Sequence, residues 1–131
     1  MKQIAILRNV SIQISKPRVW QIAINVGDQL CDVAEILEAK KKFRFAEQLN
    51  GAALSISNNI AEGSGASSNK EFSRFLDYAH RSVFENANIL IVLHRRKYIS
   101  DEQLNNFLEE LNKLARKINT FQKYLNKENP N

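Results

Sequence analysis

Residues 68–93 decide the fold, and they read SNKEFSRFLDYAHRSVFENANILIVL. The segment opens with Ser68 and Glu71 three residues apart, which is the spacing of a capping box at the start of a helix. Apolar residues then recur every three or four positions, a spacing that places them in one stripe along a helix. They are Phe72, Phe75, Leu76, Ala79, Val83, Ala87, Leu90 and Leu93. We therefore predict a long amphipathic helix that needs other helices to cover its stripe.

Apolar residues with the same period mark three further helices. The first begins at Ser15-Lys16-Pro17, where a serine can cap and a proline fits the first turn, and it ends near Lys40. The second stops at Gly63-Ser64-Gly65, and a capping box at Ser100 and Gln103 opens the last. Four such helices with short connections predict an all-α protein, an antiparallel up-down-up-down four-helix bundle over residues 16–128.

The first residues carry a different pattern. Apolar and mostly polar residues alternate there, with the apolar ones at Ile4, Ile6, Val10, Ile12 and Ile14. Alternation is typical of an extended strand, and a lone strand must pack on a domain or pair with another chain. Residues 1–15 are therefore predicted to form a short extended arm.

Composition excludes several classes of protein. The chain has 131 residues, and its 19 basic and 14 acidic residues give a net charge of +5. The longest apolar run, Ile89 to Leu93, is too short to cross a bilayer, which needs about 20 residues. Cys31 is the only cysteine, and the two histidines are fourteen residues apart, so the sequence predicts neither a disulfide nor a metal site. We expect a cytoplasmic protein without a cofactor or membrane partner.

The distribution of charge is more informative than its total. In an up-down-up-down bundle the first and third connections lie at the same end, so seven basic residues are expected to meet there: Lys40, Lys41, Lys42, Arg44, Arg95, Arg96 and Lys97. Such clusters bind the phosphates of nucleic acids, which makes RNA or another nucleic acid the expected partner. Cations near helix C-termini are also ordinary dipole partners. A structural or protein-interaction scaffold without nucleic-acid binding therefore stays open.

A ribonuclease is a further alternative. Arg74 and His80 are six residues apart on a predicted bundle helix, which resembles the Arg-x5-His arrangement of the HEPN ribonucleases. Histidine can transfer protons and arginine can hold a phosphate, so the pair suits RNA cleavage. The polar residue that usually follows the arginine is Phe75 here. No nucleophile with an adjacent base is evident, and we expect a protein that is not an enzyme.

Residues 48–63, QLNGAALSISNNIAEG, resemble the signature QLRRAxxSIPSNIAEG of the bacterial four-helix-bundle proteins encoded in 23S rRNA intervening sequences. Residues 70–82, KEFSRFLDYAHRS, are similar to the KEFxRFLxxARGS segment of the same family. The resemblance implies a cytoplasmic bacterial protein, ribosome-associated and RNA-binding by its family's suspected role, that assembles as a homopentamer. It implies no established enzymatic activity.

Several residues match this family pattern and are expected to support structure and assembly: Asn59, Glu62, Gly63, Glu71, Arg74 and Arg81. Asn59 and Glu62 fall on or near the core-facing stripe, so we expect buried partners for both, with Arg74 and Arg81 as the available cations. The chain departs from the pattern where the paired arginines are Asn50 and Gly51. Any nucleic-acid contact is therefore expected from the basic loops rather than from this motif.

Overall fold

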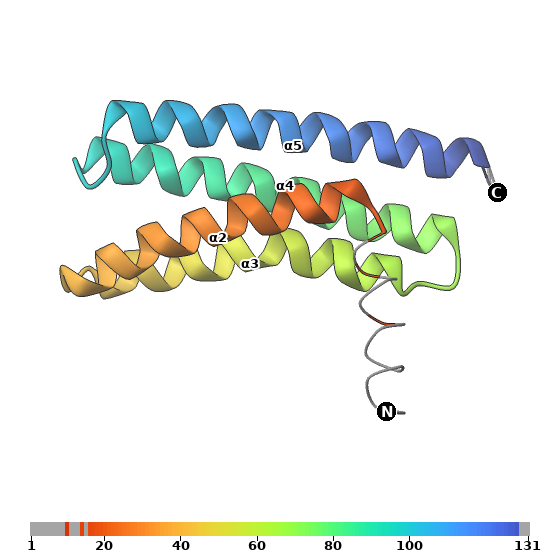
Figure 1. Cartoon of the computed structure of the whole chain (residues 1–131), viewed down its shortest axis with the longest axis horizontal. Helices are drawn as coiled ribbons and strands as arrows, with labels where there is room; N and C mark the ends of the chain where they lie inside the picture. Colours follow the sequence, from red (N-terminus) through yellow and green to blue (C-terminus); the bar gives the residue numbers. More distant parts are fainter. Residues whose placement is uncertain (1–9, 11–13, 15, 129–131) are drawn as a thin grey trace.

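Four antiparallel helices make up the protein (Figure 1). The computed structural model describes residues 16–128 together with Val10 and Ile14. The helices, labelled as in Figure 1, are α2 (Arg18–Ala39), α3 (Phe43–Ser64), α4 (Asn69–Arg95) and α5 (Asp101–Glu128). Each packs on its neighbour in the chain, and α5 returns to α2. This order is the predicted up-down-up-down bundle, and no strand occurs within the described residues.

The apolar stripes of all four helices meet in one core. Leu30 of α2, Leu49 of α3, Leu76 of α4 and Leu114 of α5 have no solvent exposure. Burying each such side chain contributes roughly 1.5–3 kcal/mol, which is the main force that holds the bundle together. The spacing of three and four in the sequence thus predicted both the helices and the face that each one buries.

Small residues let α2 and α3 approach each other closely. A methyl group added at Gly27 of α2 would lie 3.4 Å from the carbonyl oxygen of Ala53 on α3. The seam between α2 and α5 is the least extensive of the four. A groove of about 670 Å³ remains along that seam.

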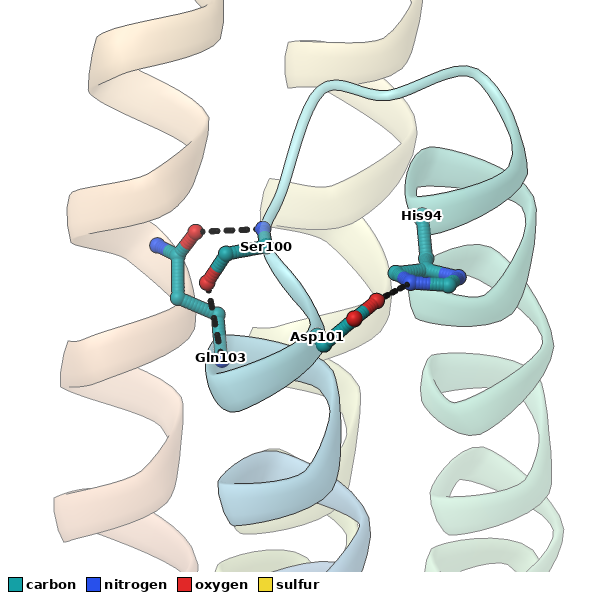
Figure 2. A network of polar contacts seen from close by, with 4 residues as sticks. All are labelled: His94, Ser100, Asp101 and Gln103. Carbon is teal, nitrogen blue, oxygen red and sulfur yellow. Dashed lines mark hydrogen bonds and ion pairs between the residues drawn. The ribbon is translucent and has the colours of Figure 1, made fainter.

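The helix starts follow the predicted capping pattern with two differences. Ser100 accepts from the Gln103 amide at 3.1 Å, and Gln103 Oε1 accepts from the Ser100 amide at 2.9 Å, which is the complete reciprocal box (Figure 2). Ser68 accepts from the Glu71 amide at 3.1 Å, but the Glu71 carboxylate accepts from Arg74. The nearby guanidinium makes the stronger, charge-assisted bond.

The second difference is at the start of α2, where Pro17 stands at the N-cap rather than inside the first turn. Pro17 has an extended backbone, with ψ of 125°, so the helix begins only after it. The Pro17 carbonyl accepts a hydrogen bond from the Trp20 amide at 3.0 Å. Ser15, the predicted cap, lies outside the described residues.

The expected extended arm, residues 1–15, also lies outside the described residues except for Val10 and Ile14. Both of these residues have helical rather than extended backbone. The backbone at these two positions therefore differs from the extended one expected, since a spacing of four residues fits a helix as well as the alternation of a strand.

No helix in the described part of the chain is both long enough and apolar enough to span a membrane.

Candidate nucleic-acid interface

The first and third connections lie at the same end of the bundle (Figure 1). Lys40, Lys41 and Lys42 separate α2 from α3, and the segment from Arg96 to Ser100 separates α4 from α5. We call this surface the basic end; it comprises the seven exposed residues Lys40, Lys41, Lys42, Arg44, Arg95, Arg96 and Lys97. The structure therefore brings all seven cations to one end.

The two basic loops have the same backbone conformation. At the end of α2, the Lys42 amide donates to the Leu37 carbonyl at 2.8 Å and the Lys41 amide to the Glu38 carbonyl at 2.9 Å. This pair of bonds is a Schellman motif, and it needs a left-handed residue at the position of Lys41, whose φ is 63°.

The end of α4 repeats the motif. The Tyr98 amide donates to Leu93 and the Lys97 amide to His94, both at 2.9 Å, and φ of Lys97 is 65°. Glycine is the usual residue at this position because it has no Cβ to clash with the backbone. Both loops instead carry lysine, so each places a cation at the tip of a turn at a cost in backbone strain.

Tyr98 joins the two loops. The Nζ of Lys42 lies 5.1 Å from the centre of the Tyr98 ring, and the Cζ of Arg96 lies 5.9 Å from it. The ring of Phe45 meets Tyr98 edge to face, with 5.5 Å between ring centres. A hydrogen bond from Arg96 and then the nearby Lys42 lower the pKa of Tyr98. Cations from two loops more than fifty residues apart in sequence thus share one aromatic side chain.

The sequence analysis did not identify Tyr98 as part of the site. In the sequence, Tyr98 is marked only by its position: it directly follows three basic residues, in a connection between two predicted helices. That pattern does not reveal which helix the ring will touch.

The third connection, between α4 and α5, is held by side-chain contacts at its two ends. His94 Nε2 of α4 and Asp101 Oδ1 of α5 are 2.5 Å apart across the loop, beside the Ser100 capping box (Figure 2). These contacts fix the loop that carries Arg96 and Lys97. Asp101 is an acidic residue at the same end of the bundle as the seven cations.

The start of α3 faces the same end. Lys42 at its N-cap makes no side-chain cap bond, and the first turn contains no acidic residue. The first amide groups of a helix carry a partial positive charge. The α3 dipole therefore has the same sign as Lys42 and Arg44, while α2 and α4 end at the same end of the bundle and their negative dipole ends offset it.

A second basic group lies along α5 and differs from the basic end. Lys113 is 3.7 Å from Glu110 and 4.0 Å from Glu109, which reduces its local charge. Other cations of α5, namely Arg116, Lys117, Lys123 and Lys127, are exposed along the helix. They do not come from two loops that meet.

The large groove between α2 and α5 is not a site for a polyanion. Its lining includes the carboxylates of Asp32, Glu109 and Glu110. Three negative groups would repel phosphates, so the most spacious hollow and the basic end are separate features.

The polar residues of the central motif are arranged differently from the prediction. Asn59 is half-buried and donates to the carbonyl of Ser55 at 2.8 Å. Ser55 in turn contacts Ser82 of α4 at 2.6 Å, while fully buried Asn86 donates to the Ala52 carbonyl at 2.7 Å. This line of bonds joins α3 to α4 without a charged residue.

The predicted ionic partners of Asn59 and Glu62 are engaged elsewhere or exposed. Glu62 is exposed, and Arg74 donates to Glu71 of its own helix at 2.7 Å. The guanidinium of Arg81 lies 5.8 Å from the ring centre of Tyr78. An exposed carboxylate is solvated by water, so Glu62 does not need the buried partner that was expected for it.

Gly63 has a structural reason to be glycine. A Cβ there would lie 2.7 Å from Cδ1 of Phe72 and 2.9 Å from Cβ of Phe75. The first turn of α4 therefore packs directly against the last turn of α3. This close approach sets the angle at which the chain turns from one helix into the next.

Arg74 and His80, the ribonuclease alternative, do not converge within the chain. Six residues turn a helix through about 600°, so their side chains leave α4 roughly 120° apart. Arg74 is paired with Glu71, and the His80 ring packs edge to face on Phe84, with 5.1 Å between ring centres.

Within the described residues, no three potential metal ligands come together. Burial, and then the negative charges of Asp28, Asp32 and Glu35, raise the pKa of the Cys31 thiol. A raised pKa keeps the sulfur protonated and unreactive, so Cys31 fits a packing role.

These features define a class of protein: an all-α four-helix bundle whose two loops at one end form a joined basic surface. The chain belongs to the family of 23S rRNA-intervening sequence proteins, whose sequence model matches residues 15–120. A solved structure of a protein of unknown function from the S23 ribosomal protein family, from Bacteroides thetaiotaomicron, has the same fold. The two share 23% identity and a TM-score of 0.76, over 80% of this chain and 98% of that one. No curated protein matches the chain.

Proposed function

We propose that the protein is a non-enzymatic oligomeric bundle that binds RNA or another nucleic acid through the basic end. The observation that supports this proposal is the joint at Tyr98, where Lys42 and Arg96 lie 5.1 and 5.9 Å from one ring centre. The other five cations are exposed in the same two loops or in the helix turns beside them.

Phosphates are the proposed ligands of this surface. Lysine and arginine side chains that are exposed on loops neutralise phosphates and release counterions, and this binding does not depend on base sequence.

Self-association multiplies this surface, and we propose a homopentamer as the assembly. Phe84 and Ile91 of α4 are 63% and 43% exposed and, seven residues apart, share one face of the helix. Leu54 of α3 is 51% exposed. Large apolar side chains on neighbouring helices favour contact with another copy of the chain.

A pair of charge-matched variants tests the nucleic-acid proposal. The first changes Lys40, Lys41 and Lys42 to Gln, and the second changes Lys117, Lys123 and Lys127 of α5 to Gln. Each removes three charges, so the net charge falls from +5 to +2 in both. Binding of a labelled RNA is measured by fluorescence anisotropy over a salt series.

The loop variant is expected to bind more weakly for every RNA sequence. The slope of log affinity against log salt should become shallower by roughly 0.7–0.9 for each phosphate that the variant no longer neutralises. The α5 variant should keep most of the affinity. An equal decrease in both variants would mean that net charge, rather than the basic end, controls binding.

Two outcomes would favour the alternatives. Absence of RNA binding by the unaltered protein at low salt would favour a structural or interaction scaffold. Cleavage of RNA by the pure protein, abolished in the His80→Ala variant, would show a ribonuclease. Native mass measurement of the same samples tests the homopentamer.

A further inference from the structure

Phe43 is an exposed aromatic residue inside the basic end. It is the first residue of α3, stands between Lys42 and Arg44, and is 60% exposed. Single exposed apolar residues are common on protein surfaces. This one is distinguished by its position, because exposed cations precede and follow it directly in the chain.

The other two phenyl or phenol rings at this end are already engaged. Phe45 and Tyr98 pack against each other, and Tyr98 also receives Lys42 and Arg96. Both rings are half-buried and belong to the joint between the loops. Among the described residues of the basic end, Phe43 is the one whose ring makes no such contact.

The backbone that carries Phe43 is fixed. The preceding residue, Lys42, donates to Leu37 at 2.8 Å, and its carbonyl accepts the Ala46 amide at 3.0 Å. These bonds hold the last turn of α2 and the first turn of α3 on either side of the ring. A ligand would therefore meet a ring whose backbone is already positioned, with little ordering left to do.

We propose that the basic end takes an unpaired, single-stranded segment of nucleic acid, with one base stacked on Phe43 and the flanking phosphates at Lys42 and Arg44. This inference rests on the proposed function and names the form of its ligand. An aromatic ring can stack on a base only when the face of that base is open. In a duplex those faces are covered by neighbouring pairs, so a duplex gains only from the cations.

The chemistry of the site fits a surface that binds single strands of any base sequence. Every base has a flat aromatic face, and stacking on phenylalanine therefore selects unpaired structure rather than base identity. Cations beside the ring hold the backbone on both sides of the stacked nucleotide. This combination of ring and flanking charge is the general design of single-strand binding surfaces.

The test compares one RNA sequence of about 12 nucleotides, a length within the range that such surfaces cover, as a single strand and as a blunt duplex at fixed salt. Three variants are needed. Phe43→Ala removes the ring, and Phe43→Trp keeps an aromatic face. Tyr124→Ala is the control, because Tyr124 is 56% exposed and follows Lys123 in the chain but lies 23 residues beyond the start of α5, about 35 Å along the helix from the basic end.

The unaltered protein is expected to prefer the single strand. Phe43→Ala should lower single-strand affinity about 5- to 150-fold, the range for removal of one stacked base, and change duplex affinity less than about twofold. Phe43→Trp should restore the preference, and Tyr124→Ala should leave it unchanged.

Three results would overturn the inference. If Phe43→Ala leaves single-strand affinity unchanged while the Lys40–Lys42 variant weakens it, the basic end binds nucleic acid without stacking. If Phe43→Ala changes the native mass, the ring is an assembly contact. Absence of binding to either RNA by the unaltered protein would refute the proposed function as well.

Discussion

Replacing Lys41 or Lys97 by glycine is expected to stabilise the protein and, at the same time, weaken its binding to nucleic acid. Both lysines have a left-handed backbone, with φ of 63° and 65°. Each occupies the position after a helix end where glycine is the favoured residue. The exchange therefore tests folding stability and nucleic-acid binding separately, because the backbone favours glycine at this position while the basic end needs the charge of lysine.

The size of the effect can be worked out from the backbone. A side chain in the left-handed region costs roughly 1–2 kcal/mol, and glycine loses about 0.5–1 kcal/mol more entropy than other residues on folding. The net gain is about 0.5–1 kcal/mol for each site. With an unfolding entropy near 2.1 cal/mol/K per residue, the 131 residues give about 0.28 kcal/mol/K, so each exchange raises Tm by about 2–4 °C.

Lys40→Gly is the matched control. Lys40 also lies in the first basic loop and loses the same charge, but its φ is −88° and its ψ is 10°, a conformation that any residue adopts. Glycine brings no relief of strain there, and its entropy lowers stability by up to about 1 kcal/mol. Urea unfolding followed by circular dichroism, at one protein concentration for all variants, measures the difference.

The reasoning fails if Lys41→Gly is no more stable than Lys40→Gly. In that case the left-handed lysine carries no strain, or side-chain contacts of Lys41 compensate for it. In RNA binding the two variants should behave alike, because each removes one cation from the same loop. A stabilised variant that binds as tightly as the unaltered protein would show that Lys41 contacts no phosphate.

Three further predictions each concern a single residue. Gly63→Ala should destabilise the fold by about 1–3 kcal/mol, because the new Cβ would lie 2.7 Å from the Phe72 ring and 2.9 Å from Cβ of Phe75. Gly51→Ala, with no atom within 4 Å of its new methyl group, should stabilise α3 by about 0.5–1 kcal/mol in the same urea titration. Alkylation of Cys31 by iodoacetamide should be slower than that of a free thiol at pH 8 and should keep rising above pH 9, since its raised pKa leaves little thiolate at lower pH. A rate equal to that of free cysteine at pH 8 would contradict the last expectation.

The fold could be predicted because its signals are local. Spacings of three and four assigned the four buried faces, and the serines at positions 68 and 100 located two helix starts within one residue. Once the helices were placed in up-down order, the meeting of the two basic loops followed from topology alone. That prediction depended only on the order of the helices and needed no knowledge of side-chain contacts.

The parts that could not be predicted depend on contacts between distant residues. Tyr98 joins the loops only because Phe45 of α3 lies beside it. Arg74 was predicted as an available cation for Asn59 and Glu62, but its guanidinium pairs with Glu71, three residues away on the same helix. A sequence shows which side chains can pair, while the choice among them depends on distances set by packing.

The left-handed lysines were missed for a different reason. Glycine or asparagine usually marks this position, so a lysine gave no sign that the backbone turns there. The only available hint is the residue that follows, because an apolar or aromatic side chain such as Tyr98 often packs back on the helix that has just ended.

The order of packing in the bundle has a consequence for how the chain folds. Apart from the seam between α2 and α5, each helix packs on the helix next to it in the chain, so most contacts join residues that are close in sequence. Helical bundles with such local topology fold within microseconds to milliseconds. Synthesis of the 64 residues from Gly65 to Glu128 takes about 3–13 s at cellular rates. The hairpin of α2 and α3 therefore has time to form while α4 and α5 are still being made, and the α2–α5 seam closes only after α5 has been made.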